Sequence, residues 1–281
     1  MKLLLLLTLT TLLSAQSVHS SLSTYFESKN FKSSIQKEDG VTYGVGADIH
    51  HNNSKYKLNY EYGKTDTKKP PLQEDLRTDK IFARYAYMLN PSLEINFNYI
   101  DILHDNIALT AGGKTVGLGL TYKVNKKLST NFTQFYTKYD DFKTFQSDFR
   151  FDYRFQTQNF KNKISSITKY ISIDEKNPQS FTKNAKNHYL TTGIKLHSHY
   201  KSYHFGAGVY FAKRAFAIMN DGFKIQHHAM EFDRTYALGI GKNISNLILR
   251  FQYIYQRATE LPRENSNVEV KSLRFIANYK F

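Results

Sequence analysis

The amino-acid sequence alternates repeatedly between apolar and polar side chains, and this period of two restricts the possible folds more than any other feature. The clearest stretch, from Phe145 to Phe155, reads FQSDFRFDYRF. Its odd-numbered positions are aromatic except for one serine, and its even-numbered positions are amide or charged. Successive side chains of a β-strand point to opposite faces, whereas a helix would scatter both sets around its circumference. We therefore interpret this stretch as a strand with one apolar and one polar face.

The same alternation recurs along the chain, and the segments between the strands alternate in length. Recognisable strands lie at about 41–51, 56–62, 81–87, 93–99, 115–122, 127–138, 145–155, 162–173, 188–198, 202–213, 229–241, 247–256 and 273–281. Long connectors are expected at about 64–79, 101–113, 174–187, 214–228 and 258–267, and the others are short turns. Short turns on one side and long loops on the other are typical of a barrel in an outer membrane.

Such barrels have an even number of strands, which adds one strand at the N-terminal end. The candidate is Thr24–Gln36, joined to the strand at 41–51 by a tight turn at Lys37–Gly40. Its alternation is weak, so twelve strands is the fallback. The predicted fold class is all-β: a transmembrane antiparallel up-and-down β-barrel of fourteen strands.

A soluble β-sandwich is the alternative fold. The chain has 21 Tyr and 21 Phe but no Trp. Roughly 40 outward-facing aromatic and aliphatic side chains exceed what one sandwich core can bury. In a membrane barrel the same side chains face lipid, with Tyr and Phe at the two interfaces.

The N-terminal segment has the layout of a secretory signal peptide. A basic start precedes a leucine-rich run from Leu3 to Leu13, which is too short to cross a bilayer as a helix. We expect a signal peptide in residues 1–20, cleaved between about residues 15 and 20, and a single barrel in residues 21–281. The chain has no Cys, which excludes disulfides, lipoprotein anchoring and thiolate metal sites.

The end of the chain carries Leu273, Phe275, Ala277, Tyr279 and Phe281 at alternating positions. With the signal peptide and the alternating strands, this pattern resembles Gram-negative outer-membrane β-barrels, whose last strand typically ends in Phe with an aromatic residue two positions earlier. The resemblance implies a location in the cell outer membrane of a Gram-negative bacterium. It also implies that Tyr279 and Phe281 are the signal read by the barrel-assembly machinery. In length and strand number the chain is similar to small monomeric porins, which favours a monomer.

The predicted inner face is polar and charged, which indicates water in the lumen. A barrel of about fourteen strands is too wide to be filled by its own side chains. Two interpretations remain open: a pore whose selectivity follows its charge pattern, or a closed charge network across a narrow lumen. We favour the pore, a porin-like channel for passive diffusion of small hydrophilic solutes. Its predicted pore-lining residues are Lys57, Arg84, Glu94, Asp148, Arg150, Asp152, Arg154, Arg250 and Arg274.

Two of these arginines give a hypothesis for selectivity. Arg250 and Arg274 lie on the last two strands. We expect these strands to pair so that the numbers of opposed residues add up to about 525, which places the two arginines at the same height in the barrel wall. Neither strand offers an inward acid there, so the wall is locally positive unless an inward-folded loop supplies a carboxylate. The channel is then expected to prefer anions, most strongly at low salt, where charges are screened least.

The alternatives to a channel are a non-conducting structural or surface-binding barrel and a barrel lipid hydrolase or protease. Asp48 with His50, or the cluster of His197, His199 and His204, could suggest a catalytic or metal site. These residues fall at the predicted periplasmic turns, so we predict no enzyme, no catalytic residues, no metal and no cofactor.

The net charge raises the question of partners, because 39 Lys and Arg stand against 24 Asp and Glu. The basic residues are scattered over strands and loops, which argues against nucleic-acid binding. We expect the loops to meet lipopolysaccharide phosphates and the apolar face to meet outer-membrane lipid. Paired glycines such as Gly206 and Gly208 are followed by no helix, so we interpret them as positions that ease strand curvature and not as a nucleotide site.

Overall fold

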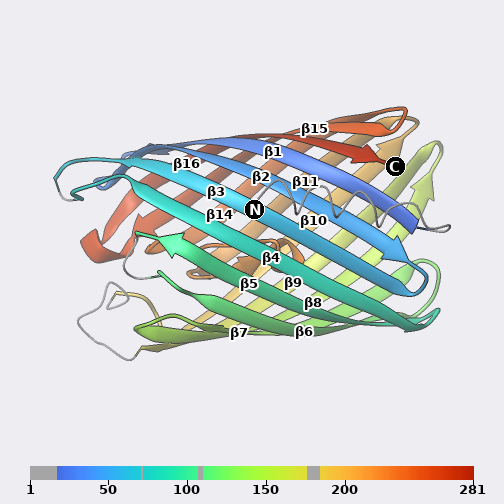
Figure 1. Ribbon diagram of the computed structural model, residues 1–281, viewed down its shortest axis with the longest axis horizontal. Coiled ribbons are helices and arrows are strands. Elements are labelled where there is room, and N and C mark those ends of the chain that lie inside the picture. Colours follow the sequence, from blue (N-terminus) through green and yellow to red (C-terminus); the bar gives the residue numbers. More distant parts are fainter. Residues whose placement is uncertain (1–17, 71, 107–109, 176–183) are drawn as a thin grey trace, which may run out of the picture.

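The computed structural model describes residues 18–70, 72–106, 110–175 and 184–281, and within these residues fourteen long strands close into one antiparallel barrel (Figure 1). The barrel strands are β1 (Val18–Lys32), β2 (Lys37–His51), β3 (Ser54–Thr67), β4 (Leu76–Asn90), β5 (Leu93–Asp105), β6 (Lys114–Lys123), β7 (Leu128–Lys138), β8 (Phe142–Thr157), β9 (Phe160–Glu175), β10 (His188–Tyr200), β11 (Tyr203–Arg214), β14 (Met230–Ile244), β15 (Leu247–Glu260) and β16 (Asn265–Lys280). The remaining elements are β12 (Ile218–Met219), η2 (Asn220–Gly222), β13 (Lys224–Ile225) and η3 (Leu261–Arg263). Among the described residues, no helix is long and apolar enough to cross a membrane.

Each barrel strand pairs with its neighbours in the chain, and β1 closes the barrel by pairing with β16. β11 pairs with β14 because β12 and β13 leave the wall and form a separate hairpin. The strand number and the antiparallel closure confirm the predicted fold class. Closure leaves no sheet edge, so the backbone hydrogen bonds of the wall are satisfied where no water is present.

The first strand differs from the prediction at both ends. It begins at Val18, six residues before the predicted Thr24 and within the expected signal peptide, and it ends at Lys32, before the predicted Gln36. The turn after β1 lies at Ser33–Gln36, so Lys37 begins β2, and the predicted turn at Lys37–Gly40 is wrong. Ser33 adopts a φ of 60°, and Ser34 Oγ accepts the Lys37 N–H at 2.8 Å, which closes the turn four residues earlier. A register shift between Lys37 and Gly40 accommodates the polar stretch within β2. Residues 1–17 of the expected signal peptide lie outside the described residues.

The connectors at one end of the barrel are short turns, as predicted, and the long connectors lie at the other end (Figure 1). Two connectors at that other end, 33–36 and 261–264, have only four residues each, so the predicted long connector at 258–267 is wrong. The connectors after β2, β4, β6, β8, β10 and β14 are the short turns, and 68–75, 106–113, 176–187 and 215–229 are the long connectors at the other end. Phe281 lies at the short-turn end, where its N–H donates to the Ser20 carbonyl at 2.9 Å. In outer-membrane barrels the short-turn end faces the periplasm.

The outer surface of the wall carries large apolar side chains. Leu118, Leu190 and Leu238 keep 67%, 60% and 63% of their surface exposed. Tyr and Phe side chains from every part of the wall lie beside them, for example Tyr43, Phe97 and Phe149. A soluble monomer rarely exposes contiguous apolar surface beyond a few hundred Å². The exposed belt is therefore the lipid-facing surface of a membrane barrel.

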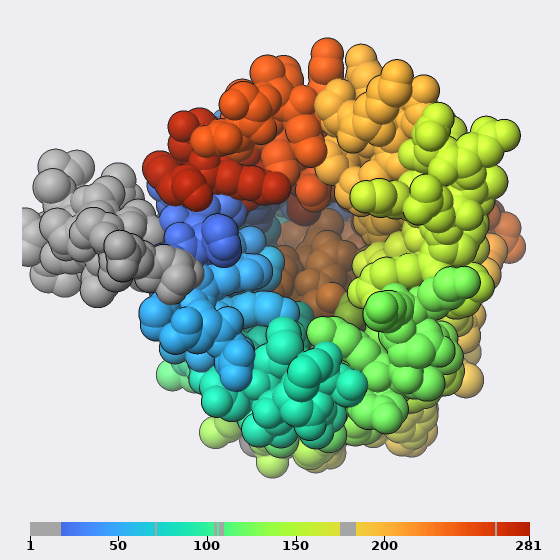
Figure 2. Space-filling view, turned by 90° about the vertical axis from the view of Figure 1, so that its right-hand side faces the viewer, coloured from blue at the N-terminus to red at the C-terminus, as the bar shows by residue number. Residues whose placement is uncertain are grey.

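The lumen is filled unevenly. Residues 215–229 turn into the barrel and pack against inward-facing apolar side chains, mainly from β4 to β9. Figure 2 looks along the barrel and shows an orange-brown segment within the ring of strands. On the other side, facing β10 to β16, a crevice remains, and both polar and apolar residues of the wall line it.

Deleting Phe281 should lower the amount of assembled barrel in the outer membrane. The ring of Phe281 contacts that of Tyr279 at a centroid distance of 5.1 Å, at the short-turn rim where aromatic side chains are favoured. The measurement is the heat-modifiable band in gels of outer-membrane fractions. Phe281→Tyr is the control and should assemble normally, whereas wild-type levels of the deletion variant would contradict the role of this residue.

Candidate functional site

Between β11 and β14 the chain enters the lumen and returns, forming the luminal hairpin (residues 215–229). Its first segment, Ala215–Met219, is at most 7% exposed. Ile218 and Met219 pair with Ile225 and Lys224, and η2 turns the chain between them. Because this segment is small and apolar, it is stable in the lumen only where the wall offers apolar partners.

The apolar side of the luminal hairpin contacts aromatic residues of the wall. The Phe216 ring lies 4.8 Å from that of Phe142 and 6.2 Å from that of Tyr139, between centroids. Phe223 lies 6.5 Å from Phe82 in the same way. Full burial of such a side chain contributes roughly 1.5–3 kcal/mol, so these contacts hold the hairpin against β4 to β9.

Polar side chains of β8 and β9 fix the hairpin further. Gln146 Oε1 accepts the Ile218 N–H at 2.8 Å, and Gln146 Nε2 donates to the Ile218 carbonyl at 2.7 Å. Lys169 Nζ donates to the same carbonyl at 3.0 Å and forms an ion pair with Asp148. Buried backbone groups need partners, and here the wall side chains supply them.

The tip of the hairpin is held by Arg150. Its Nη1 donates to the two carboxylate oxygens of Asp221 at 2.6 and 2.5 Å, and its Nε lies 3.3 Å from Asp152 Oδ2. Burial alone would raise the pKa of Asp221, but the Arg150 guanidinium holds that pKa well below its usual range. Next to it, Gly222 has a φ of +94°, and a Cβ there would lie 2.9 Å from Asn98 Oδ1. The tip therefore touches β5 where only glycine fits.

The returning part of the hairpin brings positive charge to β1 and β16. Lys224 Nζ lies 3.6 Å from Glu27 Oε1, and Arg274 Nε donates to Glu27 Oε2 at 2.9 Å. Burial lowers the pKa of Lys224 to about 8, and Glu27 acts in the opposite direction. One carboxylate therefore faces two cations, which leaves this part of the lumen positive at neutral pH.

A third set of contacts joins the hairpin to β3 and β4. Lys80 Nζ lies 2.5 Å from Glu61 Oε1 and 3.2 Å from His227 Nε2. Tyr25 also donates its hydroxyl to Glu61. Lys80 and Glu61 are 5% and 6% exposed, so removing one partner would leave a buried charge unpaired. The contact of Lys80 with His227 fixes the returning part of the hairpin to this side of the wall.

A polar crevice of about 310 Å³ remains between the hairpin and β10 to β16. Among the described residues that line the crevice, none is acidic. Its amides include Asn220, Gln226, Gln252 and Gln256, and its cations are Lys195, Arg214, Lys224 and Arg274. Two of these cations, Lys224 and Arg274, have the carboxylate of Glu27 beside them, outside the crevice lining.

Hollows connect the crevice to the short-turn end. A small one shares His197 and Gln252 with the crevice and also borders Arg250. Arg250 borders in turn a vestibule of about 670 Å³, and His197 borders a second vestibule of about 550 Å³ with Arg154. The crevice, the small hollow and the two vestibules thus border common wall residues in succession toward the periplasmic mouth.

The predicted pore-lining residues fall into three groups. Lys57 pairs with Asp48 at 2.9 Å, and Arg84 lies 3.9 Å from Glu94. The first group thus forms ion pairs along the wall. A second group holds the luminal hairpin, and a third group, which includes Lys57 again, lines the vestibules or the crevice. Arg150 contacts the hairpin directly, while Asp148 and Asp152 pair with Lys169 and Arg150, which bind it. The vestibules or the crevice are lined by Lys57, Arg154, Arg250 and Arg274.

The predicted relation between Arg250 and Arg274 is wrong by one residue. β15 and β16 pair at positions that sum to 526, which sets Arg274 opposite Gln252 and Arg250 opposite Ile276. Residues that lie directly opposite each other on paired strands point to the same face of the sheet. The inward positions of both strands have even numbers here, so the numbers of two directly opposed inward residues must add up to an even number. The expected lack of an acid is also wrong for Arg274. Glu27 lies directly opposite it across the closing pair β1–β16.

Sequence reasoning misses several charged residues of the lumen: Glu27, Lys80, Lys169, Lys195, Arg214 and Lys224. Glu27 lies on the strand whose alternation is weak. Lys169 lies on β9, where Ile164 faces outward with 40% exposure while Ile167 is buried inside. Apolar residues at inward positions such as Ile167 and Phe82 are the signal that something apolar occupies the lumen.

The His cluster lies at the short-turn end, as predicted. The rings of His199 and His204 are 4.4 Å apart, and His204 contacts Asn243. Within the described ranges, no group of three His, Cys, Asp or Glu residues could hold a metal ion.

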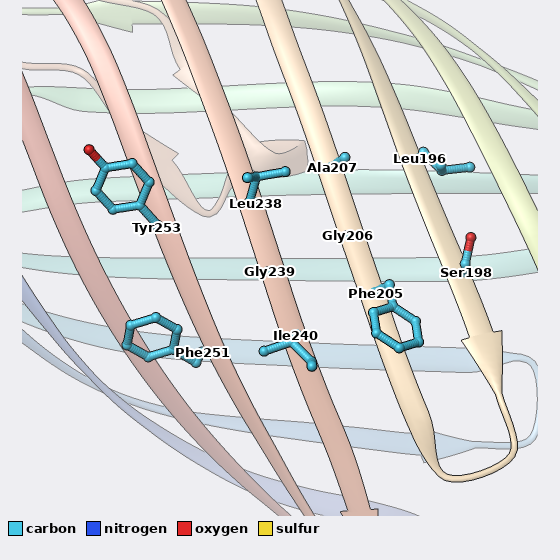
Figure 3. Close-up of a pocket in the computed structure, with 10 residues that line it drawn as sticks. All are labelled: Leu196, Ser198, Phe205, Gly206, Ala207, Leu238, Gly239, Ile240, Phe251 and Tyr253. Atoms are coloured by element: carbon cyan, nitrogen blue, oxygen red, sulfur yellow. The ribbon is translucent and has the colours of Figure 1, made fainter.

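Another hollow, of about 410 Å³, lies on the outside of the wall (Figure 3). Its side chains are mostly apolar, including Leu196, Phe205, Leu238 and Phe251. It passes over the backbone of Gly206 and its neighbours, on the lipid-facing surface. This lining suits acyl chains, so we do not place the route of a hydrophilic solute there.

No protein-family model and no curated protein matches the chain. Among solved structures, the fold resembles a "Bacterial polysaccharide outer membrane secretin", with a TM-score of 0.58 and 9% identity, over 93% of this chain and 98% of that chain. It also resembles the Ralstonia pickettii toluene transporter TbuX, with a TM-score of 0.54 and 11% identity, over 95% of this chain and 90% of that chain. The likeness shows the fold, that of a Gram-negative outer-membrane β-barrel, as the sequence predicts.

Proposed function

We propose that this outer-membrane barrel is a passive, porin-like channel for small hydrophilic solutes and that it prefers anions. The observation that carries the proposal is the polar crevice beside the luminal hairpin, which connects to vestibules at the short-turn end. The hairpin narrows the lumen and the crevice remains as the path for small solutes. Passage then depends on the width and charge of that path.

The charge along the path supports a preference for anions. The described lining of the second vestibule contains no acidic residue and four cations, Lys127, Arg154, Lys161 and Lys163. The described lining of the crevice has no acidic residue either, and of its cations Lys224 and Arg274 share Glu27. The first vestibule has Asp48 in its lining, but this carboxylate is paired with Lys57. Fixed charges of one sign in a narrow path raise the local concentration of the opposite ion.

A non-conducting structural or surface-binding barrel is the second candidate. The observation that favours it is the hairpin itself, which is anchored through Gln146, Arg150 and Lys80 to separate parts of the wall. A hairpin held so firmly would close the lumen if the crevice did not reach the outer mouth. We also propose a monomer that is recognised by the barrel-assembly machinery through its last strand.

Planar-bilayer recording of the refolded protein tests the channel. We expect steady conductance and a reversal potential displaced toward that of chloride under a KCl gradient. The displacement should grow at low salt, because the Debye length rises to about 30 Å at 0.01 M. A silent barrel would support the second candidate, and a displacement toward the potassium potential would refute the anion preference.

Replacing Arg250 with Ala should reduce that displacement. Arg250 lines the first vestibule and forms no ion pair among the described residues, so its charge acts on passing ions. The matched control is Lys126→Ala, which removes an exposed charge from a periplasmic turn and should leave the reversal potential unchanged. Equal reversal potentials for the Arg250 variant and the wild type would show that this residue does not set selectivity.

A further inference from the structure

Arg214 differs from the other cations of the lumen because its guanidinium is fully buried and only partly bonded. Its Nη2 donates to Thr235, but its Nε and Nη1 have no hydrogen-bond partner among the described residues. The rings of Tyr210 and Phe232 lie 5.4 and 5.7 Å from its Cζ, which positions the group without neutralising it. Buried charged donors that lack an acceptor are unfavourable. Because Arg214 borders the crevice, an anion there is the natural acceptor.

The neighbouring groups of the crevice add both charge and hydrogen-bonding capacity. Lys224 shares the single carboxylate of Glu27 with Arg274, so Glu27 does not neutralise both cations. Gln226 is buried, and its Oε1 also has no partner among the described residues. That oxygen accepts hydrogen bonds only, so it calls for a donor, such as a hydroxyl group, on whatever occupies the crevice.

We propose that the crevice binds a small hydroxylated carboxylate, with Arg214 and Lys224 on its carboxylate and Gln226 on one of its hydroxyl groups. The volume of about 310 Å³ sets the size at one small molecule. This inference rests on the proposed function, because it assigns a solute class to the same crevice. It goes further in predicting a saturable site, whereas charge alone would give only a diffuse preference for anions.

Binding can be measured without conduction, by saturation-transfer difference NMR on the refolded barrel in detergent micelles. The probe is gluconate, with glucose as its uncharged counterpart. We expect saturable binding of gluconate and none of glucose. Inorganic phosphate, as competitor, separates a hydroxy acid from a free phosphate. The proposal is supported if phosphate displaces gluconate only at concentrations higher than those at which gluconate itself binds. Tighter binding of phosphate than of gluconate would overturn it.

Substitutions then test the named residues. Arg214→Gln and Lys224→Gln should each weaken gluconate binding by about tenfold, which is the scale of one charge-assisted hydrogen bond. Lys126→Gln, in an exposed turn, is the matched control and should bind as the wild type does. Lys224 lies on the hairpin and not in the wall, so its variant keeps the test valid even if Arg214→Gln does not assemble. Unchanged affinity of the Lys224 variant would overturn the assignment.

The two proposals fail in different ways. A barrel that binds gluconate but stays silent in bilayers would reject the channel and keep the site. A barrel that conducts chloride without saturable gluconate binding would reject the site and keep the channel.

Discussion

Replacing residues 216–228 with a short Gly-Ser turn should raise the conductance of the barrel several-fold. The luminal hairpin occupies the β4 to β9 side of the lumen, and without it water and ions would fill that space. The wall should survive the change, because Arg214 pairs with Phe232 and the two ends are therefore already adjacent. The measurement is single-channel conductance in planar bilayers, together with the heat-modifiable band that reports assembly.

The matched control shortens the β3–β4 connector, 68–75, which lies at the same end of the barrel. The residues described there are exposed or half-buried at the rim and contact the wall near Ser34 and Thr67. Conductance of this variant should equal that of the wild type. If removal of the hairpin left the conductance equally unchanged, the hairpin would not be what limits the current.

Substituting Gly206 with Phe should nearly abolish the current while leaving assembly intact. Among the described residues, a Cβ at Gly206 would have one neighbour within 4 Å, His197 Nδ1 at 3.9 Å. The residue paired with Gly206 on β14 is Gly239. The new ring would therefore enter open space without disturbing the strands. That space belongs both to the crevice and to the small hollow that leads to the vestibule, so the ring would block their junction.

The neighbouring residue provides the control for this substitution. Ala207 is exposed and borders the lipid-facing hollow of Figure 3, so Ala207→Phe adds the same bulk on the other face of the same strand. Its conductance should match that of the wild type. Equal currents from the Gly206 and Ala207 variants would place the route away from β11.

The barrel itself could be predicted from the sequence because each strand has two chemically different faces. Phe149 and Arg150 show this directly, since one is exposed to lipid and the other binds the hairpin. A shift of one residue would invert both faces, so the alternation fixes the register within each hairpin. Arg250 and Arg274 both face inward, so by the same rule the numbers of opposed residues on their two strands must add up to an even number. The predicted sum of 525 is therefore excluded. The predicted turn at Lys37–Gly40 is wrong for another reason. The polar residues there stay within strand β2, which accommodates them by a register shift against β3.

The luminal hairpin could not be derived in the same way. Its segment was expected to be a long outer connector, and nothing local in Ala215–Met219 says which wall it will pack against. The decisive contacts join residues far apart in the chain, such as Gln146 with Ile218 and Glu27 with Lys224. Inward-facing Phe82 and Ile167 indicate that an apolar partner exists, but not which one.

The uneven filling of the lumen also gives the wall two mechanical characters. Along β4 to β9 the sheet is backed by a packed interior, and close-packed protein has low compressibility and transmits strain. Along β10 to β16 a single sheet separates lipid from water, and its inward positions 206 and 239 are glycines without side chains. We therefore expect the second part to deform first when the surrounding bilayer thins or bends. The crevice is bordered by this second part, so we expect the lateral tension of the bilayer to change its width.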